Sequence, residues 1–214
     1  DRLRSRGLGD VYKRQDDVLS VLALEDIVRD VRGGIIHNYP LVKIGTQYWM
    51  RDNLEASSYV GGEALPRLDA VTANVVGYLQ STTEHYFYTA NVVLSNKILP
   101  AHWSIPDWKD WNILKDYLNG EASLLKSGTW LPLKAGEQVQ PATNLSGFNG
   151  IPVGMYVGAF QTDYEKKHLA YWTLDNANAA IDIKVFYLKS DTDIIEESNA
   201  GVDTKAFAIR CIRK

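Results

Sequence analysis

Cysteine, methionine and long apolar runs are scarce in this sequence. The 214 residues include one Cys and two Met, and one cysteine cannot close a disulfide within the chain. No apolar stretch approaches the roughly 20 residues of a membrane-spanning helix, so we expect no membrane insertion of this segment. Lys and Arg form no cluster with interleaved aromatic residues in the body of the chain. With a net charge of −3, these features disfavour nucleic acid as a partner.

Aromatic residues are abundant instead. The chain contains 6 Trp, 12 Tyr and 5 Phe, within a composition that is 45% hydrophobic and 23% charged. That composition is typical of a globular domain, and a chain of this length buries roughly 70% of its unfolded surface. Trp and Tyr combine a large apolar area with one polar group, so they suit both protein cores and ligand-facing surfaces. Composition alone does not separate these two uses.

The N-terminal residues 1–15 have an unusual origin in our interpretation. Residues 5–15 read SRGLGDVYKRQ, and this stretch back-translates into the adaptor arm and mosaic end of a common sequencing transposon. We therefore predict that residues 1–15 are a sequencing-adaptor artefact, the alternative being a natural basic tail. They contain five Lys or Arg and two Asp, so the rest of the chain carries a net charge of −6.

Residues 16–34 are interpreted as a linker or the tail of an upstream domain, followed by one domain over residues 35–214. In residues 16–32, apolar residues recur at a helix-like spacing (Val21, Leu24, Val28 and Val31) and the pattern stops at Gly33 and Gly34. A helix is the first expectation for this stretch, and a strand with a short helix is the alternative.

Short strands and one good helix are predicted within the domain. Residues 41–44 and 48–50 flank a tight turn and predict a β-hairpin, while residues 86–89, 181–188 and 205–212 are expected to be strands. Along residues 205–212, side chains are expected to alternate between two faces. A second, shorter helical piece is predicted over residues 122–126.

The strongest helix signal lies at residues 107–119. Asp107 is a candidate N-cap, Asp110 stands at the capping-box position, and Gly120 ends the segment. The apolar residues Trp111, Leu114, Tyr117 and Leu118 are expected to form one buried stripe.

Several segments together resemble a known family. They read VKIGTQYWMRDNL (residues 42–54), PAHWSIP (100–106), LKSGTW (125–130), TNLSGFNGIPVG (143–154) and FAIRCI (207–212). Their order and combination resemble the Fibrobacter succinogenes major paralogous domain family. The motif residues that carry the resemblance are Gly45, Trp49, Asn53, Trp103, Pro106, Trp111, Asn144, Gly147, Phe148, Pro152, Gly154, Arg210 and Cys211.

The resemblance implies an α+β, C-type-lectin-like fold: short twisted antiparallel strands, one or two helices and long loops. It also implies an extracellular or cell-surface bacterial setting, with no established enzymatic activity. One departure stands out, because the family usually pairs a cysteine before the central Pro with the cysteine near the C-terminus. Here Leu99 occupies the first position, so Leu99 and Cys211 are expected to face each other in the interior.

Candidate chemical groups do not form a recognisable catalytic or metal-binding set. The four histidines lack metal-ligand spacing, and Gln140-Pro141 is followed by Ala142 rather than by the acid or amide of a calcium-dependent lectin. Cys211 is interpreted as a core thiol rather than a nucleophile. The acidic stretch Asp191, Asp193, Glu196, Glu197 and Asp203 is interpreted as a solvated hairpin tip, with a cation site as the alternative. Asn144-Leu145-Ser146 matches a glycosylation pattern but is interpreted as a turn.

We therefore expect a non-catalytic binding or adhesion module, associated with a lipoprotein or a fimbria, whose ligand is a glycan or a protein. No catalytic residue, cofactor or metal ligand is assigned. Two alternatives remain open, namely an enzyme of the sulfatase-modifying type on the same fold and a purely structural cap domain. The single cysteine argues against the enzyme, because that chemistry needs paired, metal-competent cysteines.

Overall fold

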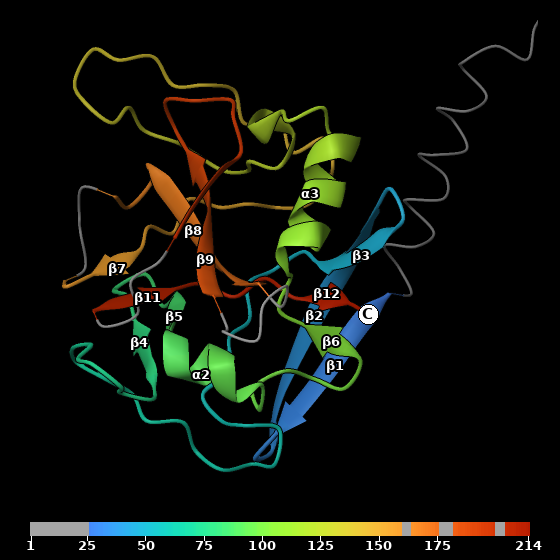
Figure 1. The fold of residues 1–214 in the computed structure, drawn as a ribbon, viewed down its shortest axis with the longest axis vertical. Coiled ribbons are helices and arrows are strands. Elements are labelled where there is room, and N and C mark those ends of the chain that lie inside the picture. The colour runs from blue at the N-terminus through green and yellow to red at the C-terminus, as the bar shows by residue number, and fades with distance from the viewer. Residues whose placement is uncertain (1–25, 160–163, 176–181, 200–203) are drawn as a thin grey trace, which may run out of the picture.

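The fold is mostly antiparallel β-sheet with two α-helices, as seen in a computed structural model that describes residues 26–159, 164–175, 182–199 and 204–214. This arrangement agrees with the predicted α+β class. The first sheet has the order β1-β2-β3-β12-β6, the second β10-β9-β8 and the third β4-β5-β11-β7 (Figure 1). The strands of the first sheet are β1 (Ile27–Arg32), β2 (Ile35–Ile44), β3 (Gln47–Met50), β6 (Trp103–Ser104) and β12 (Ile212–Arg213). The other strands are β4 (Tyr78–Gln80), β5 (Tyr86–Thr89), β7 (Tyr156–Val157), β8 (His168–Asp175), β9 (Asp182–Lys189), β10 (Glu196–Asn199) and β11 (Lys205–Phe207). The helices are α2 (Ala90–Ser95), α3 (Trp108–Tyr117) and the 3₁₀ helix η1 (Ala122–Leu124).

The predicted hairpin of β2 and β3 is confirmed. Ile44 lies opposite Gln47, and the intervening Gly45 has a φ of 60°, a left-handed conformation that glycine adopts without a steric penalty. The C-terminal strand β12 then pairs with β3, where Ile212 lies opposite Trp49. This pairing places residues 47–50 and the C-terminal strand in one sheet.

The helix predicted for residues 16–32 is wrong over Ile27–Arg32, which form β1. This strand pairs with β2 through a two-residue turn at Gly33 and Gly34, both of which have positive φ. Asp30 and Arg32 are buried and form an ion pair at 2.7 Å. Side chains two residues apart lie on the same face of a strand, so Asp30 and Arg32 both point inward. The sequence prediction considered only apolar residues as inward-facing and therefore did not recognise this strand. The interpretations of residues 1–15 and 16–25 concern residues outside the described part of the chain and stay predictions.

Helix α3 begins as predicted. The Asp107 carboxylate accepts from the Asp110 backbone N–H at 3.0 Å, and the Asp110 carboxylate accepts from the Asp107 N–H at 2.8 Å. Trp111, Leu114 and Leu118 are buried, which confirms most of the apolar stripe. Tyr117 is the exception, because its side chain is 54% exposed. Six residues correspond to ~600° of helical rotation, which turns Tyr117 away from the Trp111 face.

The strand predicted for residues 205–212 is divided into β11 and β12, which belong to different sheets. The expected alternation is present, but neither face is exposed. Ala206, Ala208 and Ile212 enter one hydrophobic cluster, whereas Phe207 and Ile209 enter another. The segment therefore runs between two cores. The strand predicted at residues 181–188 is present as β9, that at 86–89 as β5, and the short helical piece after residue 121 as η1.

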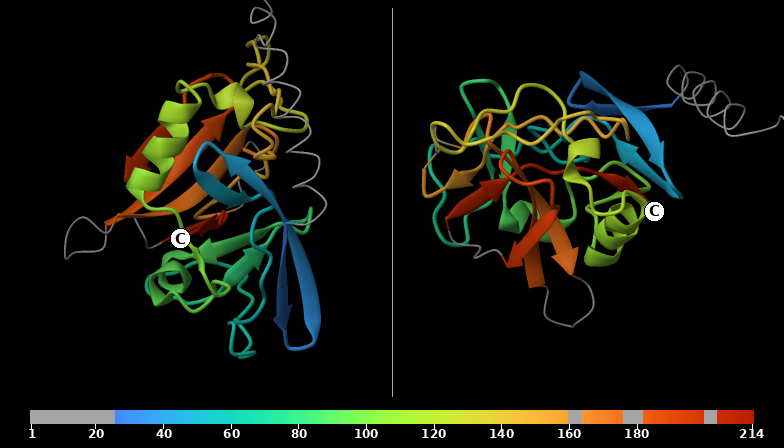
Figure 2. Two further views of the ribbon diagram at one scale, coloured as in Figure 1. Left: turned by 90° about the vertical axis from the view of Figure 1, so that its right-hand side faces the viewer. Right: turned by 90° about the horizontal axis from the view of Figure 1, so that it is seen from above.

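Two hydrophobic cores organise the molecule, and the views in Figure 2 show the sheets around them. The first core contains Trp49, Trp111 and Phe148; the second contains Tyr88, Trp172 and Phe207. Successive residues of β8 enter different cores: Tyr171 lies in the first core and Trp172 in the second. Tyr171 and Trp172 are therefore core residues, and both are fully buried.

Candidate functional site

Most of the motif residues surround one buried guanidinium, that of Arg210, which is 1% exposed. Its Nη2 donates to Asn53 Oδ1 at 2.7 Å and to the Tyr171 hydroxyl at 2.9 Å. Its Nη1 donates to the backbone carbonyl oxygens of Met50, Arg51 and Phe148. No carboxylate of the described residues pairs with this cation, so its hydrogen bonds go to neutral oxygens.

Aromatic rings enclose the same group. The Arg210 guanidinium lies 4.4 Å from the ring centre of Phe148. Phe148 contacts Trp49 edge-on at 5.6 Å, and Trp49 lies 4.8 Å from Trp111. We call these residues, with Asn53 and Tyr171, the Arg210 centre. Every direction around the guanidinium is occupied by the protein itself, so the Arg210 centre stabilises the fold and does not present a free donor to a ligand.

The loop of residues 144–149 supports this centre. Asn144 has a φ of 50°, and its Oδ1 accepts from the Asn149 backbone N–H at 2.8 Å. Gly147 has a φ of 74°, and a Cβ there would lie 3.1 Å from a Val42 methyl carbon. The predicted turn at Asn144-Leu145-Ser146 is confirmed, because Gly147 N–H donates to the Asn144 carbonyl at 2.9 Å.

The remaining motif residues lie at turns and element ends away from Arg210. Pro106 precedes α3, and its carbonyl accepts from the Leu174 N–H at 3.1 Å. The Pro152 carbonyl accepts from the Lys166 N–H at 2.9 Å, and Gly154, with a φ of 83°, donates to the His168 carbonyl at 2.8 Å. Trp103 lies in β6. The structure therefore brings about half of the predicted motif residues together and distributes the others along the loops.

Cys211 is fully buried, and burial raises the pKa of its thiol to about 12. The thiol is therefore protonated at neutral pH, which is unfavourable for a nucleophile. Leu99 and Cys211 belong to the same hydrophobic cluster. Both residues are therefore interior, and the expectation that their side chains face each other stays a prediction.

His168 is also buried rather than poised for chemistry. Burial, followed by the neighbouring Lys189 charge, lowers the pKa of His168 to about 4. The imidazole is neutral at pH 7 and packs edge-on against Tyr164, with ring centres 4.6 Å apart.

The acidic stretch is tied to the fold. The Asp193 carboxylate accepts from the Ser123 hydroxyl at 3.1 Å and from its backbone N–H, while Glu196 pairs with Lys189. Within the described parts of the chain, no group of three or more His, Cys, Asp or Glu is placed to hold a metal ion. Asp203 lies outside those parts.

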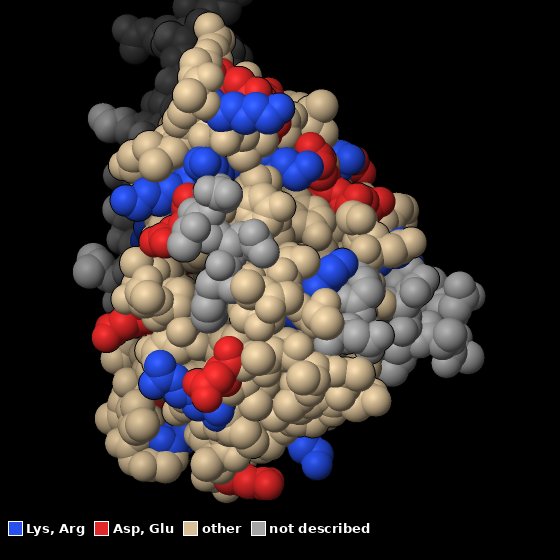
Figure 3. Space-filling model, turned by 90° about the vertical axis from the view of Figure 1, so that its left-hand side faces the viewer, with Lys and Arg blue, Asp and Glu red and all other residues tan. Residues whose placement is uncertain are grey.

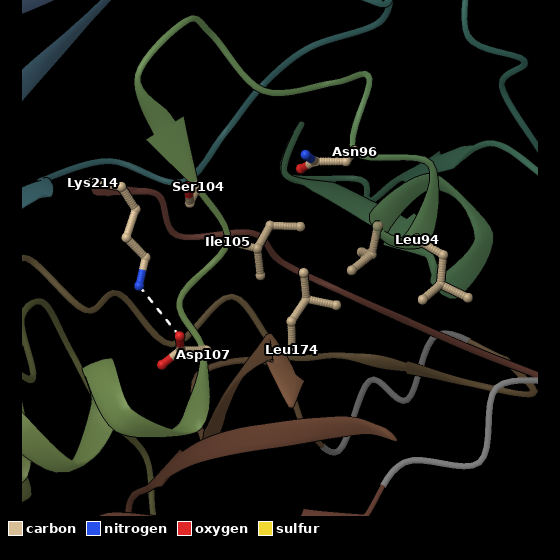
Figure 4. A pocket seen from close by; sticks show the side chains of 8 residues that line it. Leu94, Asn96, Ser104, Ile105, Asp107, Leu174 and Lys214 are labelled. Carbon is tan, nitrogen blue, oxygen red and sulfur yellow. Dashed lines mark hydrogen bonds and ion pairs between the residues drawn. The ribbon is translucent and has the colours of Figure 1, made fainter. Parts of the chain in front are cut away.

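An open pocket of about 240 Å³, lined by described residues, is a candidate ligand site (Figure 4). Its apolar lining comes from α2, from the segment after β6 and from β8; its polar lining comes from the end of α2, from β6, from the N-cap of α3 and from the last residue of the chain. The lining residues are Val93, Leu94, Asn96, Ser104, Ile105, Asp107, Leu174 and Lys214. Figure 4 shows Ile105 and Leu174 between the Asp107–Lys214 pair on one side and Leu94 of α2 and its C-cap Asn96 on the other. We call this site the rim pocket.

An ion pair sets the electrostatics of the rim pocket. Lys214 Nζ lies 3.3 Å from Asp107 Oδ2 and 2.6 Å from Asp110 Oδ2. Burial alone would raise the pKa of Asp107, but hydrogen bonds from the Asp110 backbone and the Lys214 charge lower it. Burial likewise opposes the Lys214 charge, and the two carboxylates raise the Lys214 pKa above its ordinary value. The lowered pKa of Asp107 and the raised pKa of Lys214 keep both of these groups charged at neutral pH.

The sequence analysis named some residues of this pocket but did not predict a pocket. Ser104 and Ile105 lie in the PAHWSIP segment, which was interpreted only as part of the family resemblance. Asp107 follows that segment and was interpreted as the N-cap of the helix. Leu94, Leu174 and Lys214 come from distant parts of the chain and have no distinguishing sequence signal. Only the pairing of β12 with β6 and the hydrogen bond from Leu174 to Pro106 bring them to one place.

The comparison with known families agrees with the motif residues around Arg210. A sequence model described as the Fibrobacter succinogenes major domain matches residues 42–213, well over half of the chain. The chain belongs to this family. The matched range includes the Arg210 centre and most of the rim pocket, whereas β1 lies before it. Searches of curated proteins and of solved structures gave no match for this Fibrobacter succinogenes major domain.

The charged side chains on the surface of this Fibrobacter succinogenes major domain are mixed in sign. On the face in Figure 3, basic and acidic side chains are interspersed across a largely uncharged surface. That face offers no continuous basic area for a nucleic-acid backbone. No helix in the described part of the chain is long and apolar enough to cross a membrane.

Proposed function

We propose that this domain is a non-catalytic binding module that engages a glycan or protein ligand at the rim pocket. One observation carries the proposal: an apolar floor and a fixed ion pair converge on one solvent-open cavity. Ligand pockets commonly combine apolar walls with a few placed polar groups that orient the ligand. A volume of about 240 Å³ suits a small unit, such as one sugar ring or one peptide side chain.

We propose further that the fold is C-type-lectin-like and that the domain acts at the bacterial cell surface or outside the cell, as part of a lipoprotein or a fimbria-associated protein. The pairing of β3 with β12, which brings the beginning and end of the domain together, supports the fold assignment. The family resemblance supports the setting.

The binding function is tested with glycan and peptide arrays and two matched variants. Leu174→Arg places a long cation in the rim pocket, whereas Leu145→Arg makes the same change at a loop residue that is 77% exposed. We expect the unmodified domain and Leu145→Arg to bind the same array members and Leu174→Arg to lose that binding. Binding that survives Leu174→Arg would place the site elsewhere. Binding to no member of either array would favour the structural cap.

The enzyme of the sulfatase-modifying type makes a different prediction, because it needs a reactive cysteine. We expect Cys211 in the native domain to react with a thiol reagent far more slowly than in denaturant, since the thiol is buried and protonated. Equal native and denatured labelling rates would reopen the case for a functional thiol.

A further inference from the structure

Four neighbouring strands place alternating cationic and aromatic side chains in one row. Lys43 in β2 lies opposite Tyr48 in β3, and Arg213 in β12 lies opposite Trp103 in β6. Because β12 also pairs with β3, Arg213 reaches Tyr48 from the other side. The Lys43 ammonium lies 5.5 Å and the Arg213 guanidinium 5.9 Å from the Tyr48 ring centre. We call Lys43, Tyr48, Arg213 and Trp103 the cation–aromatic row.

The row faces away from the first core. Side chains alternate along a strand, and the neighbours Ile44, Trp49 and Ile212 are buried in that core. Lys43 and Arg213 are exposed and Tyr48 is partly exposed, whereas Trp103 is largely buried and forms the inner end of the row.

The two cations have no acidic partner in the described residues. Their nearest attractive contact is the Tyr48 ring, which is a weak interaction at an exposed site. Two strand spacings separate them, or about 9.6 Å between backbones. The chain as a whole carries a net charge of −3, so this pair of positive charges is opposite in sign to the net charge of the chain.

We propose that the cation–aromatic row binds an acidic polysaccharide, whose anionic groups contact Lys43 and Arg213 beside the Tyr48 hydroxyl. Carboxylates and sulfates both accept charge-assisted hydrogen bonds from these donors, so the shared chemistry is an anionic group on a saccharide. Two cations are too few for a nucleic acid or an anionic membrane, which need extended basic surfaces.

An acidic peptide fits the row less well. Extended peptides commonly bind by pairing with a free sheet edge. The row instead crosses the face of β3 and β12, which are interior strands with a neighbour on each side. A chain lying across that face contacts side chains rather than backbone, as a polysaccharide does.

The row is separate from the rim pocket. Arg213 belongs to the row, whereas the next residue, Lys214, pairs with Asp107 and Asp110 at the pocket. Trp103 of the row and Ser104 of the pocket are successive residues of β6. Successive residues project to opposite sides of a strand, so the two sites open on different faces. The inference therefore goes beyond the proposed pocket function and is tested separately from it.

The test measures binding of the full chain to polygalacturonate and dextran sulfate by affinity electrophoresis and calorimetry. Methyl-esterified polygalacturonate and dextran are the matched neutral polymers. Two charge-matched double variants are compared: Lys43→Gln/Arg213→Gln removes the row cations, and Lys97→Gln/Lys109→Gln removes two exposed lysines elsewhere.

We expect the row variant to bind the acidic polymer at least about tenfold more weakly, and the control variant to change by less than about twofold. Preference for polygalacturonate or for dextran sulfate identifies carboxylate or sulfate as the bound group. Leu174→Arg should leave this binding intact, which distinguishes it from the pocket function.

Three outcomes would overturn the proposal. The first is absence of binding to both acidic polymers, and the second is equal binding to the neutral polymers or equal loss in both double variants. The third is tighter binding to polyglutamate than to either acidic polysaccharide, which would indicate an acidic-peptide site. Lys43→Arg/Arg213→Lys preserves the charges and should retain binding, so a loss caused by misfolding is recognised.

Discussion

Arg210 and Lys214 are cations four residues apart, yet their surroundings differ completely. Arg210 is 1% exposed and its partners are neutral oxygens and aromatic rings. The Lys214 side chain is 45% exposed and pairs with two carboxylates at the rim pocket. The comparison teaches that the depth of a cation, rather than its charge, decides whether it holds the fold or remains available to a ligand.

The physical reason is whether water can replace the hydrogen bonds of the cation when the cation is removed. When a buried donor is removed, the oxygen atoms that it satisfied cannot turn to water, and each costs its desolvation energy. A partly exposed ion pair exchanges with water and is screened by salt, so its net contribution is small. Four substitutions test this difference.

Replacement of Arg210 should be the most damaging. Arg210→Met leaves Asn53 Oδ1 and several backbone carbonyls without their donor. We expect a loss of about 5 kcal/mol or more in the free energy of unfolding, measured by denaturant titration. Arg29→Met, at an exposed position of β1, is the matched control and should change little. A loss below ~2 kcal/mol for Arg210→Met would show that the centre is not structural.

The aromatic wall of the Arg210 centre should follow. Trp111→Ala removes a ring that is 3% exposed and that stacks on Phe186 at 3.8 Å. We expect a loss of roughly 3–5 kcal/mol by the same titration. Tyr117→Ala, on the exposed side of α3, should cost under about 1 kcal/mol. Equal losses would mean that the inward face of α3 is assigned incorrectly.

The helix cap at the rim pocket should have an intermediate effect. Asp107→Ala removes the N-cap acceptor of α3 and should cost about 1–2 kcal/mol at pH 7, whereas exposed Asp69→Ala should have little effect. Folding lowers the pKa of Asp107, so its stabilisation is complete above the ordinary value of 3.8 and is lost as the pH falls through the lowered pKa. The difference between wild type and Asp107→Ala should therefore shrink in acid. A difference that grows below pH 4 would contradict this sign.

The Lys214 pair should matter least for stability. Lys214→Gln should cost under about 1 kcal/mol, because the side chain is nearly half exposed. Folding raises the pKa of Lys214, so its contribution is present below the ordinary value of 10.5 and is lost as the pH rises through the raised pKa. Thermal melting at low and high salt measures the effect. A loss comparable to that of Arg210→Met would remove the distinction between the two cations.

Local features of the fold could be predicted from local sequence. The capping box of Asp107 and Asp110, the β2–β3 turn at Gly45 and the turn at Asn144 each depend on residues within a few positions of one another. The prediction for Ile27–Arg32 was wrong for two reasons. A short apolar pattern is compatible with either a helix or a strand. In addition, the inward face of this strand carries the charged residues Asp30 and Arg32, which an apolar pattern does not register. Tyr117 was predicted to be buried because it lies six residues after Trp111. The rotation over six residues instead turns its side chain away from the buried face of α3.

The sequence by itself determined the family, the capped helix, the hairpin and the motif residues that enclose Arg210. Only the tertiary structure decided that residues 205–212 run between two cores, because burial on both faces depends on what packs against each side. It also decided the location of the rim pocket and of the cation–aromatic row, whose members come from strands distant in the chain. Strand pairing over long sequence separations brings such residues together, and it leaves no local signature in any one segment.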